Sequence, residues 1–232
     1  MMYPFTPTAY LATVIIFAVI SLFMFLSSRE KGNGTVRDVA LMFLFLAGYS
    51  FSLSLPFYFN PSNLEFIAKG YALGMVFVFL VMLVGVRVQL FIAGKSSRPA
   101  GFPPAALISL AGFYVLYLLL SDLRLPIIDP AGVIVWNANY ASGALAGGVT
   151  LLYGIVWAYY FLKAAAVVGK LTHKIKMFSL GVAGFVFGAL GYFKFTAETA
   201  EASALALQVF LATTAILALI LLVLRFFDPN DK

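Results

Sequence analysis

The stretch KLTHKIKMFSLGVAGFVFGALGYFKF, from Lys170 to Phe195, decides how this chain folds. It begins with a basic cluster, continues as an apolar run that contains several glycines, and ends with Lys194 and Phe195. Lys176 and Lys194 are 18 residues apart, which corresponds to about 27 Å along a helix. Because the hydrocarbon core of a bilayer is about 30 Å thick, we expect the two ammonium groups to reach opposite interfaces and anchor a membrane-spanning helix.

The glycines of this stretch predict a packing face. Their spacings of three, four and three residues place them on one side of a helix; they are Gly181, Gly184, Gly188 and Gly191. Gly70 and Gly74 form a similar pair earlier in the chain. Small residues let the backbones of membrane helices approach each other closely. We expect these six glycines to mediate packing within a helical bundle, with homodimerisation through the sixth helix as the alternative.

The composition indicates a membrane protein. The chain is 63% hydrophobic and 10% charged, whereas soluble domains are about 45–50% apolar and about 25% charged. The net charge of +6 does not indicate a nucleic-acid partner, because the basic residues flank apolar stretches, where they meet lipid headgroups. The absence of cysteine excludes disulfides and thiolate metal sites.

Seven stretches are long and apolar enough to cross a bilayer. They cover residues 8–27, 36–57, 66–91, 104–120, 141–162, 177–195 and 204–227. The sequence therefore predicts an all-α, polytopic protein in which residues 1–232 form a single seven-helix transmembrane domain. We expect it to lie in the cell (inner) membrane, in contact with the lipid bilayer.

The distribution of Lys and Arg predicts the orientation of the chain. The connections alternate between basic segments and neutral or acidic ones. Placing the basic set in the cytoplasm leaves three cations outside, namely Lys69, Arg124 and Lys194, and twelve inside, namely Arg29, Lys31, Arg37, Arg87, Lys95, Arg98, Lys163, Lys170, Lys174, Lys176, Arg225 and Lys232. Since short cytoplasmic loops are enriched in Lys and Arg, we expect the N-terminus outside and the C-terminus inside.

The residues required for several membrane-protein chemistries are absent from the spans. The last span has no lysine between residues 204 and 224 to carry a retinal Schiff base. His173 is the only histidine, and its basic surroundings predict a cytoplasmic loop. The spans contain no His and carboxylate cluster for a metal ion, and Ser50, Ser52 and Ser54 have no basic partner in sequence. We therefore predict no enzymatic activity, no metal and no cofactor. Binding of a lipid, quinone or pigment is the alternative.

Candidate ligand-binding residues gather on the predicted outer side. The longest connection, residues 121–140, combines aromatic and polar side chains, and further charges lie at the same level. The candidates are Lys69, Arg124, Trp136, Asn137, Asn139, Tyr140, Lys194 and Glu198. Aromatic rings with a few convergent polar groups can form a pocket. The alternative is that these residues belong to the interfacial aromatic belt and to an ordinary polar loop.

One segment carries a family resemblance. YGIVWAYYFLKAAAVVGKLTHKIKMFSLGVAGFVFGALGYF, residues 153–193, and the preceding DPAGVIVW, residues 129–136, resemble the seven-helix sensor region that precedes bacterial histidine kinases and diguanylate cyclases. The resemblance implies a sensor with an outside N-terminus. The chain ends at LRFFDPNDK, without a signalling domain, so a sensor of this kind would act through a protein partner.

Three functions are consistent with these observations. The first is a receptor-like sensor, which predicts an outer cavity with polar walls. The second is an accessory or scaffold subunit of a larger membrane complex, which predicts a tightly packed bundle. The third is a transporter or channel for an uncharged or lipid-like solute, which predicts a cavity that reaches the bilayer midplane. The nine carboxylates lie in loops or at helix ends, so the spans contain no evident proton or sodium relay.

Overall fold

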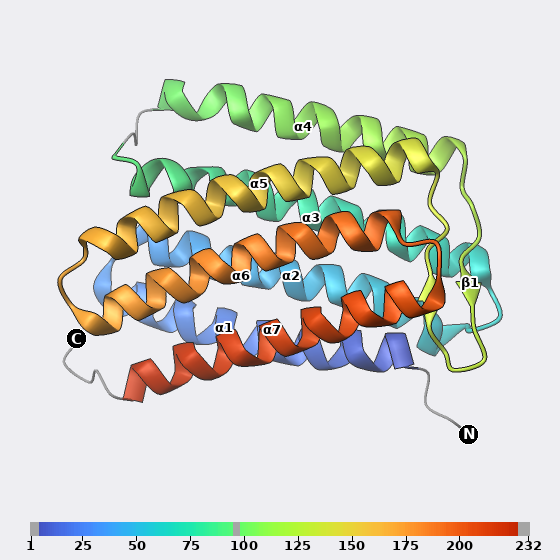
Figure 1. Ribbon diagram of the computed structural model, residues 1–232, viewed down its shortest axis with the longest axis horizontal. Helices are drawn as coiled ribbons and strands as arrows, with labels where there is room; N and C mark the ends of the chain where they lie inside the picture. The colour runs from blue at the N-terminus through green and yellow to red at the C-terminus, as the bar shows by residue number, and fades with distance from the viewer. Residues whose placement is uncertain (1–4, 95–97, 227–232) are drawn as a thin grey trace.

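The computed structural model describes residues 5–94 and 98–226 (Figure 1). Its helices are α1 (Phe5–Lys31), α2 (Gly34–Phe59), α3 (Leu64–Ile92), α4 (Arg98–Ser121), α5 (Tyr140–Val167), α6 (Leu171–Thr196) and α7 (Ala200–Phe226). All seven are long and apolar enough to cross a membrane. The prediction of an all-α, multi-pass seven-helix bundle is therefore confirmed. Lys95, Phe227 and Lys232, which the predicted spans and charge distribution included, lie outside the described residues.

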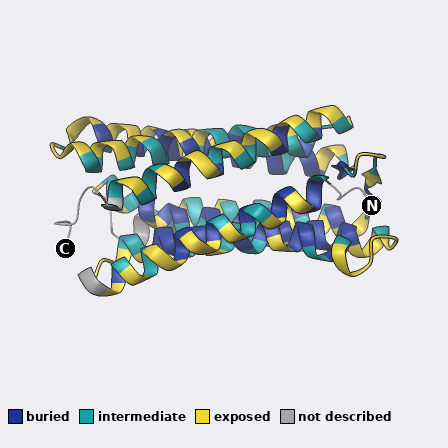
Figure 2. Cartoon of the chain, turned by 90° about the horizontal axis from the view of Figure 1, so that it is seen from below, coloured by how far each residue is buried: buried dark blue, intermediate teal, exposed yellow. Residues whose placement is uncertain are grey.

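The contacts between helices form a closed ring. Each helix packs against the next one in the chain, α7 returns to α1, and α3 also touches α5. Exposed residues run along the helices from end to end rather than only near the ends (Figure 2). Leu107, Leu110 and Phe113 of α4, for example, are each more than 60% exposed. Such an outer surface matches a bundle whose periphery contacts lipid tails.

Asparagine side chains define the starts of three helices. Asn33 Oδ1 accepts hydrogen bonds from the backbone N–H groups of Thr35 and Val36, at 3.0 and 3.3 Å. Asn63 and Asn139 cap α3 and α5 in the same way. These caps satisfy amide groups that have no partner inside the helix, and they fix where each span begins.

Two segments extend further as helix than the sequence predicted. Residues 171–176 form the first turns of α6, so His173 lies in a helix and not in a loop. No glycine or proline follows Gly169 in this basic segment, and the helical hydrogen bonding therefore continues beyond the apolar part. Helix α4 begins at Arg98 and contains Pro103 and Pro104, which lie in its second turn and leave the carbonyl groups of residues 99 and 100 without their usual helical donors.

The connection between α4 and α5 contains a hairpin that the sequence did not predict. Strands β1 (Ile127–Ile128) and β2 (Ile134–Val135) pair antiparallel. Asp129 Oδ1 accepts from Val133 N at 2.7 Å inside the turn. Thr6 at the start of α1 ties the hairpin to the bundle, because its Oγ1 accepts from Ile134 N at 3.0 Å and its N–H donates to Gly132 O at 3.2 Å.

The glycine face of α6 lies against α5. A Cβ atom built on Gly188 would be 2.8 Å from the carbonyl oxygen of Thr150 and 2.9 Å from Gly154 Cα. Gly181 faces Phe161, Gly184 faces Trp157 and Gly191 faces Thr150, all on α5. This face is covered by α5 within the same chain, which is the packing inside a bundle that the sequence predicted. Gly70 and Gly74 face α2 in a similar way, at Ser52 and Pro56 for Gly70 and at Ser52 and Tyr49 for Gly74.

The close approach of α5 and α6 predicts a large difference between two glycine substitutions. Gly188→Ala places a methyl group within contact distance of backbone atoms that cannot move aside, and we expect a loss of about 1–3 kcal/mol of stability. Gly148→Ala, on the exposed side of α5 with no neighbouring atom within 4 Å, should stabilise the helix by up to about 1 kcal/mol. Thermal unfolding of the purified variants measures both, and equal midpoints would contradict this packing.

Candidate functional site

Lys194 lies in the last turn of α6, and its side chain turns into the bundle. Its Nζ donates a hydrogen bond to Tyr49 Oη. The same nitrogen lies 4.5 Å from the ring centroid of Tyr10, 4.7 Å from that of Tyr49 and 5.5 Å from that of Trp136. The sequence predicted that Lys194 extends outward as an interfacial anchor, and the structure instead surrounds its ammonium group with aromatic rings.

The rings around Lys194 form the outer aromatic cluster, which consists of Tyr10, Tyr49, Tyr71 and Trp136. Tyr71 and Trp136 stack with centroids 4.9 Å apart and planes inclined by 14°. Tyr10 and Tyr49 meet edge to face at 6.1 Å and 84°. A cation over an aromatic face gains about 0.5–2 kcal/mol, depending on how far it is desolvated. The aromatic faces therefore attract the Lys194 ammonium group at the end of the bundle that carries the α4–α5 connection.

No carboxylate pairs with Lys194 among the side chains that the structure describes. The ion pairs in that part of the chain join Lys69 to Glu65 at 2.6 Å, Arg87 to Asp38 at 3.4 Å and Arg124 to Asp122 at 3.1 Å. An ammonium group has three N–H donors and no acceptor. The hydrogen bond to Tyr49 uses one of them, so the cation has further capacity to bind an oxygen atom.

A cavity of about 140 Å³ extends from Lys194 into the bundle. Along α6 its lining runs from Lys194 back to Leu180, a distance of about 21 Å. Six of the seven helices contribute, all except α4; the lining residues are Tyr10, Val39, Met42, Phe43, Leu46, Tyr49, Val78, Val81, Met82, Thr150, Tyr153, Trp157, Leu180, Ala183, Gly184, Phe187, Gly188, Leu190, Gly191, Lys194, Phe195, Ala206, Leu207, Phe210 and Leu217. A cavity of this volume and length is narrow.

The walls of the cavity are apolar, because most polar atoms of the lining residues are hydrogen-bonded to other groups of the protein. Trp157 Nε1 donates to Leu180 O at 2.9 Å, and Thr150 Oγ1 donates to Gly147 O at 2.9 Å. The hydroxyl of Tyr153 is buried without a partner. Lys194 is the charged residue of the lining. An occupant would therefore meet one cationic end and a long hydrophobic channel.

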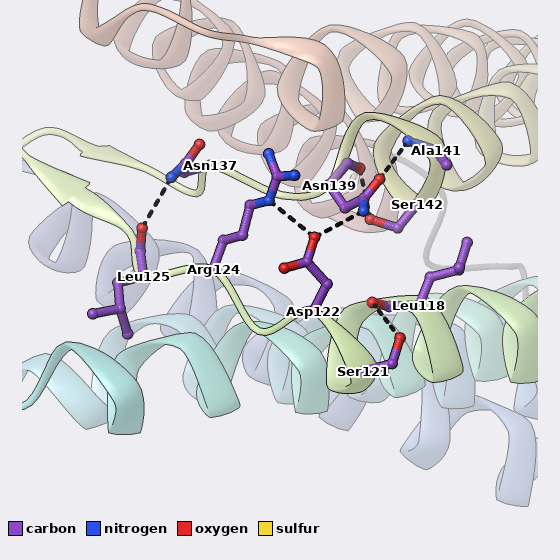
Figure 3. A network of polar contacts seen from close by, with 9 residues as sticks. All are labelled: Leu118, Ser121, Asp122, Arg124, Leu125, Asn137, Asn139, Ala141 and Ser142. Carbon is purple, nitrogen blue, oxygen red and sulfur yellow. Dashed lines mark hydrogen bonds and ion pairs between the residues drawn. The ribbon is translucent and has the colours of Figure 1, made fainter.

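The outer loop forms a separate polar network at the protein surface (Figure 3). Asp122 Oδ2 accepts hydrogen bonds from Asn139 Nδ2 at 2.9 Å and from Arg124 Nε at 3.1 Å. Asn137, which has a positive φ of 47°, donates to Leu125 O at 3.3 Å. A second cavity beside this network, at Arg124 and Trp136, has a volume of about 10 Å³, which is about enough for one water molecule.

The structure divides the eight predicted ligand-binding residues into groups. Of these eight residues, Lys194 alone lines the long cavity. Trp136 lies next to Lys194 as part of the outer aromatic cluster. Arg124 and Asn139 both donate hydrogen bonds to Asp122, and Asn137 donates one to Leu125 O in the same loop. The others are exposed: Lys69 pairs with Glu65 on α3, Tyr140 is 77% exposed, and Glu198 lies in the α6–α7 connection.

Sequence reasoning missed Tyr10 and Phe210, which line the cavity from α1 and α7. Tyr49 and Tyr153 also line it, and in the sequence they are aromatic residues of the spans with no signal that points to a cavity. Tyr10, Thr13 and Phe17 are all at most 2% exposed, and their spacing of three and four residues is a helical-face signal that could have identified the inward side of α1.

These observations define an integral, multi-pass membrane protein with a seven-helix bundle, six helices of which line an apolar cavity. Comparisons with protein-family models, with curated proteins and with solved structures give no significant match. In the described part of the chain, no three His, Asp or Glu side chains lie close enough to share a metal ion.

The loop network predicts a specific acid sensitivity. The hydrogen bond from Asn139 and the contact with Arg124 hold the pKa of the Asp122 carboxyl below its usual range. Because this pKa is lower in the folded state, the carboxylate stabilises the fold above its unfolded-state pKa, and the contribution is lost as the pH falls below about 4. We expect Asp122→Asn to remove this part of the pH dependence of the thermal midpoint. Identical acid-side profiles for the two proteins would contradict it.

Proposed function

We propose that the protein is a non-enzymatic, receptor-like membrane sensor that binds a lipophilic molecule inside its helical ring. The observation that supports this proposal is the apolar cavity with Lys194 at its outer end. Ligand sites are typically concave and mostly apolar, with a small number of polar groups that fix the orientation of the ligand. The cavity is deeper and less polar than the outer pocket expected from the sequence, which favours a lipophilic ligand over a water-soluble one.

The position of the cavity would allow a bound ligand to change how the helices pack. An occupant would touch six helices at once, and a ligand shifts a conformational equilibrium when it contacts two packing arrangements differently. A cytoplasmic protein partner could read such a shift at residues 29–38 or 163–176, the basic connections at the opposite end of the bundle. The resemblance to the sensor regions of histidine kinases and diguanylate cyclases supports the same proposal.

Transport of an uncharged or lipid-like solute is the second candidate. The length of the cavity favours it, because a lining of about 21 Å exceeds half of the hydrocarbon thickness. Two features favour binding over passage. Trp136 lies beside the Lys194 ammonium group at the outer end, and the inner end of the lining consists of apolar helix residues such as Val39 and Leu217. A tightly packed accessory subunit is the least favoured, because the bundle is hollow.

The binding proposal is tested by native mass spectrometry of protein released from its own membrane. We expect a small molecule bound to the wild-type chain. Ala183→Phe, which projects a ring into the cavity from a residue that is 5% exposed, should remove it. Val182→Phe is the matched control, because Val182 is its neighbour on α6 and is 40% exposed, and it should retain the bound molecule.

Other outcomes would redirect the assignment. Stoichiometric copurification with further membrane proteins and an empty cavity would overturn the sensor in favour of the accessory subunit. A bound molecule that also crosses protein-containing vesicles faster than protein-free ones would favour the transporter.

We further propose that the N-terminus lies outside and the C-terminus in the cytoplasm of the cell (inner) membrane. The excess of Lys and Arg in alternate connections supports this orientation. Since the chain has no cysteine, single-cysteine variants report it directly. Ala131→Cys in the hairpin turn should react with a membrane-impermeant maleimide in intact cells, whereas Gly169→Cys between α5 and α6 should react only after permeabilisation. The reverse pattern would invert the topology.

A further inference from the structure

We propose that the ligand of the cavity is a single-chain amphiphile with a carboxylate head, held by Lys194, and an extended hydrocarbon tail directed toward Trp157. This inference rests on the proposed function, since it names the chemical class that the same cavity binds. It follows from three properties of the cavity: its charge, its shape and the position of Trp157.

The charge of the cavity selects the head group. Lys194 Nζ bonds to Tyr49 Oη and faces aromatic rings, and no described carboxylate pairs with it. A buried cation without a counter-ion is costly unless a partner balances its charge. A carboxylate brings the missing negative charge and accepts the remaining N–H groups through short, charge-assisted hydrogen bonds. An alcohol or a hydrocarbon would leave the ammonium group without a counter-ion.

The shape of the cavity selects the tail. A cavity of about 140 Å³ is too small for a broad polycyclic body, and its lining extends for about 21 Å along α6, which favours a narrow, extended occupant. Below Lys194 the lining on α6 includes Gly191, Gly188 and Gly184, and because they lack side chains, Thr150 and Trp157 of α5 pack closely against them and form that wall of the channel. Phe187 and Phe210 pack against each other in the lining, with ring centroids 5.3 Å apart, and offer apolar contact to methylene groups.

Trp157 marks the deep part of the channel. It packs on Gly184, which lies ten residues before Lys194 on α6, or about 15 Å along the helix. An extended dodecyl chain is of comparable length, so the tail of such a ligand would end beside the Trp157 indole. Trp157 is 4% exposed, and quenchers dissolved in the surrounding bilayer therefore reach it poorly.

The experiment uses Trp157 as the reporter. The chain has two tryptophans, so Trp136→Phe leaves Trp157 as the single fluorophore and keeps an aromatic ring beside Lys194. This protein is reconstituted in phosphatidylcholine vesicles and titrated with ω-bromododecanoic acid. We expect saturable quenching of Trp157 by the terminal bromine. Unlabelled dodecanoic acid should reverse it at a concentration at least about tenfold lower than 1-dodecanol does, as expected for one charge-assisted contact.

Two lysine variants in the same background assign the head group. Lys194→Met removes the cation and keeps a side chain of similar length, and it should abolish the preference for the acid over the alcohol. Lys69→Met removes an exposed cation that pairs with Glu65 and should leave that preference unchanged. If the alcohol competes as well as the acid, or if Lys194→Met keeps the preference, the carboxylate assignment is overturned while the cavity remains a binding site. If Trp157 is not quenched and nothing else occupies the cavity in native mass spectra, the proposed function itself fails.

Discussion

The contact between α5 and α6 determines the rest of the bundle. Lipid tails are as apolar as the helices, so association in a membrane depends on close packing rather than on the hydrophobic effect. Gly154 and Gly188 bring the two backbones together, and this fixes both the distance and the rotation of α6. With one side of α6 held against α5, the side that carries Phe187 and Lys194 faces the interior of the ring. The cavity is therefore a by-product of how two neighbouring helices pack.

Polar contacts complete the ring on its other side. Thr13 Oγ1 donates to Ser50 Oγ at 2.8 Å, and Ser21 Oγ donates to Ala40 O at 2.8 Å. Both bonds join α1 to α2 at buried positions, where a hydroxyl group needs a partner. Each interhelical bond of this kind contributes only about 0.6 kcal/mol on average. They fix the register of α1, and this places Tyr10 beside Lys194.

The sequence predicted the elements more successfully than their directions. Long apolar runs and the spacing of the α6 glycines arise from local composition, and they could be interpreted without knowledge of the neighbours. The direction of the Lys194 side chain could not be interpreted in this way. Its distance from Lys176 is the same whether the side chain extends to the membrane interface or turns into the bundle. What distinguishes the two is a set of rings from α1, α2 and the outer loop, and no local pattern links Tyr10, Tyr49 and Trp136. The hairpin was missed because its two-residue strands are too short to show an alternating pattern.

The hairpin also constrains the order in which the molecule can be assembled. The backbone of Thr6 and its hydroxyl bond to Gly132 and Ile134, so the first turn of α1 obtains these partners from a segment synthesised more than a hundred residues later. During translation, α1 can enter the bilayer and pair with α2 while its outer end still lacks those bonds. That end becomes fixed only when the connection between α4 and α5 has been synthesised and has folded. The contact that holds the start of α1 against the hairpin is thus formed late in biogenesis, after the segments of α1 and α2 have both been made.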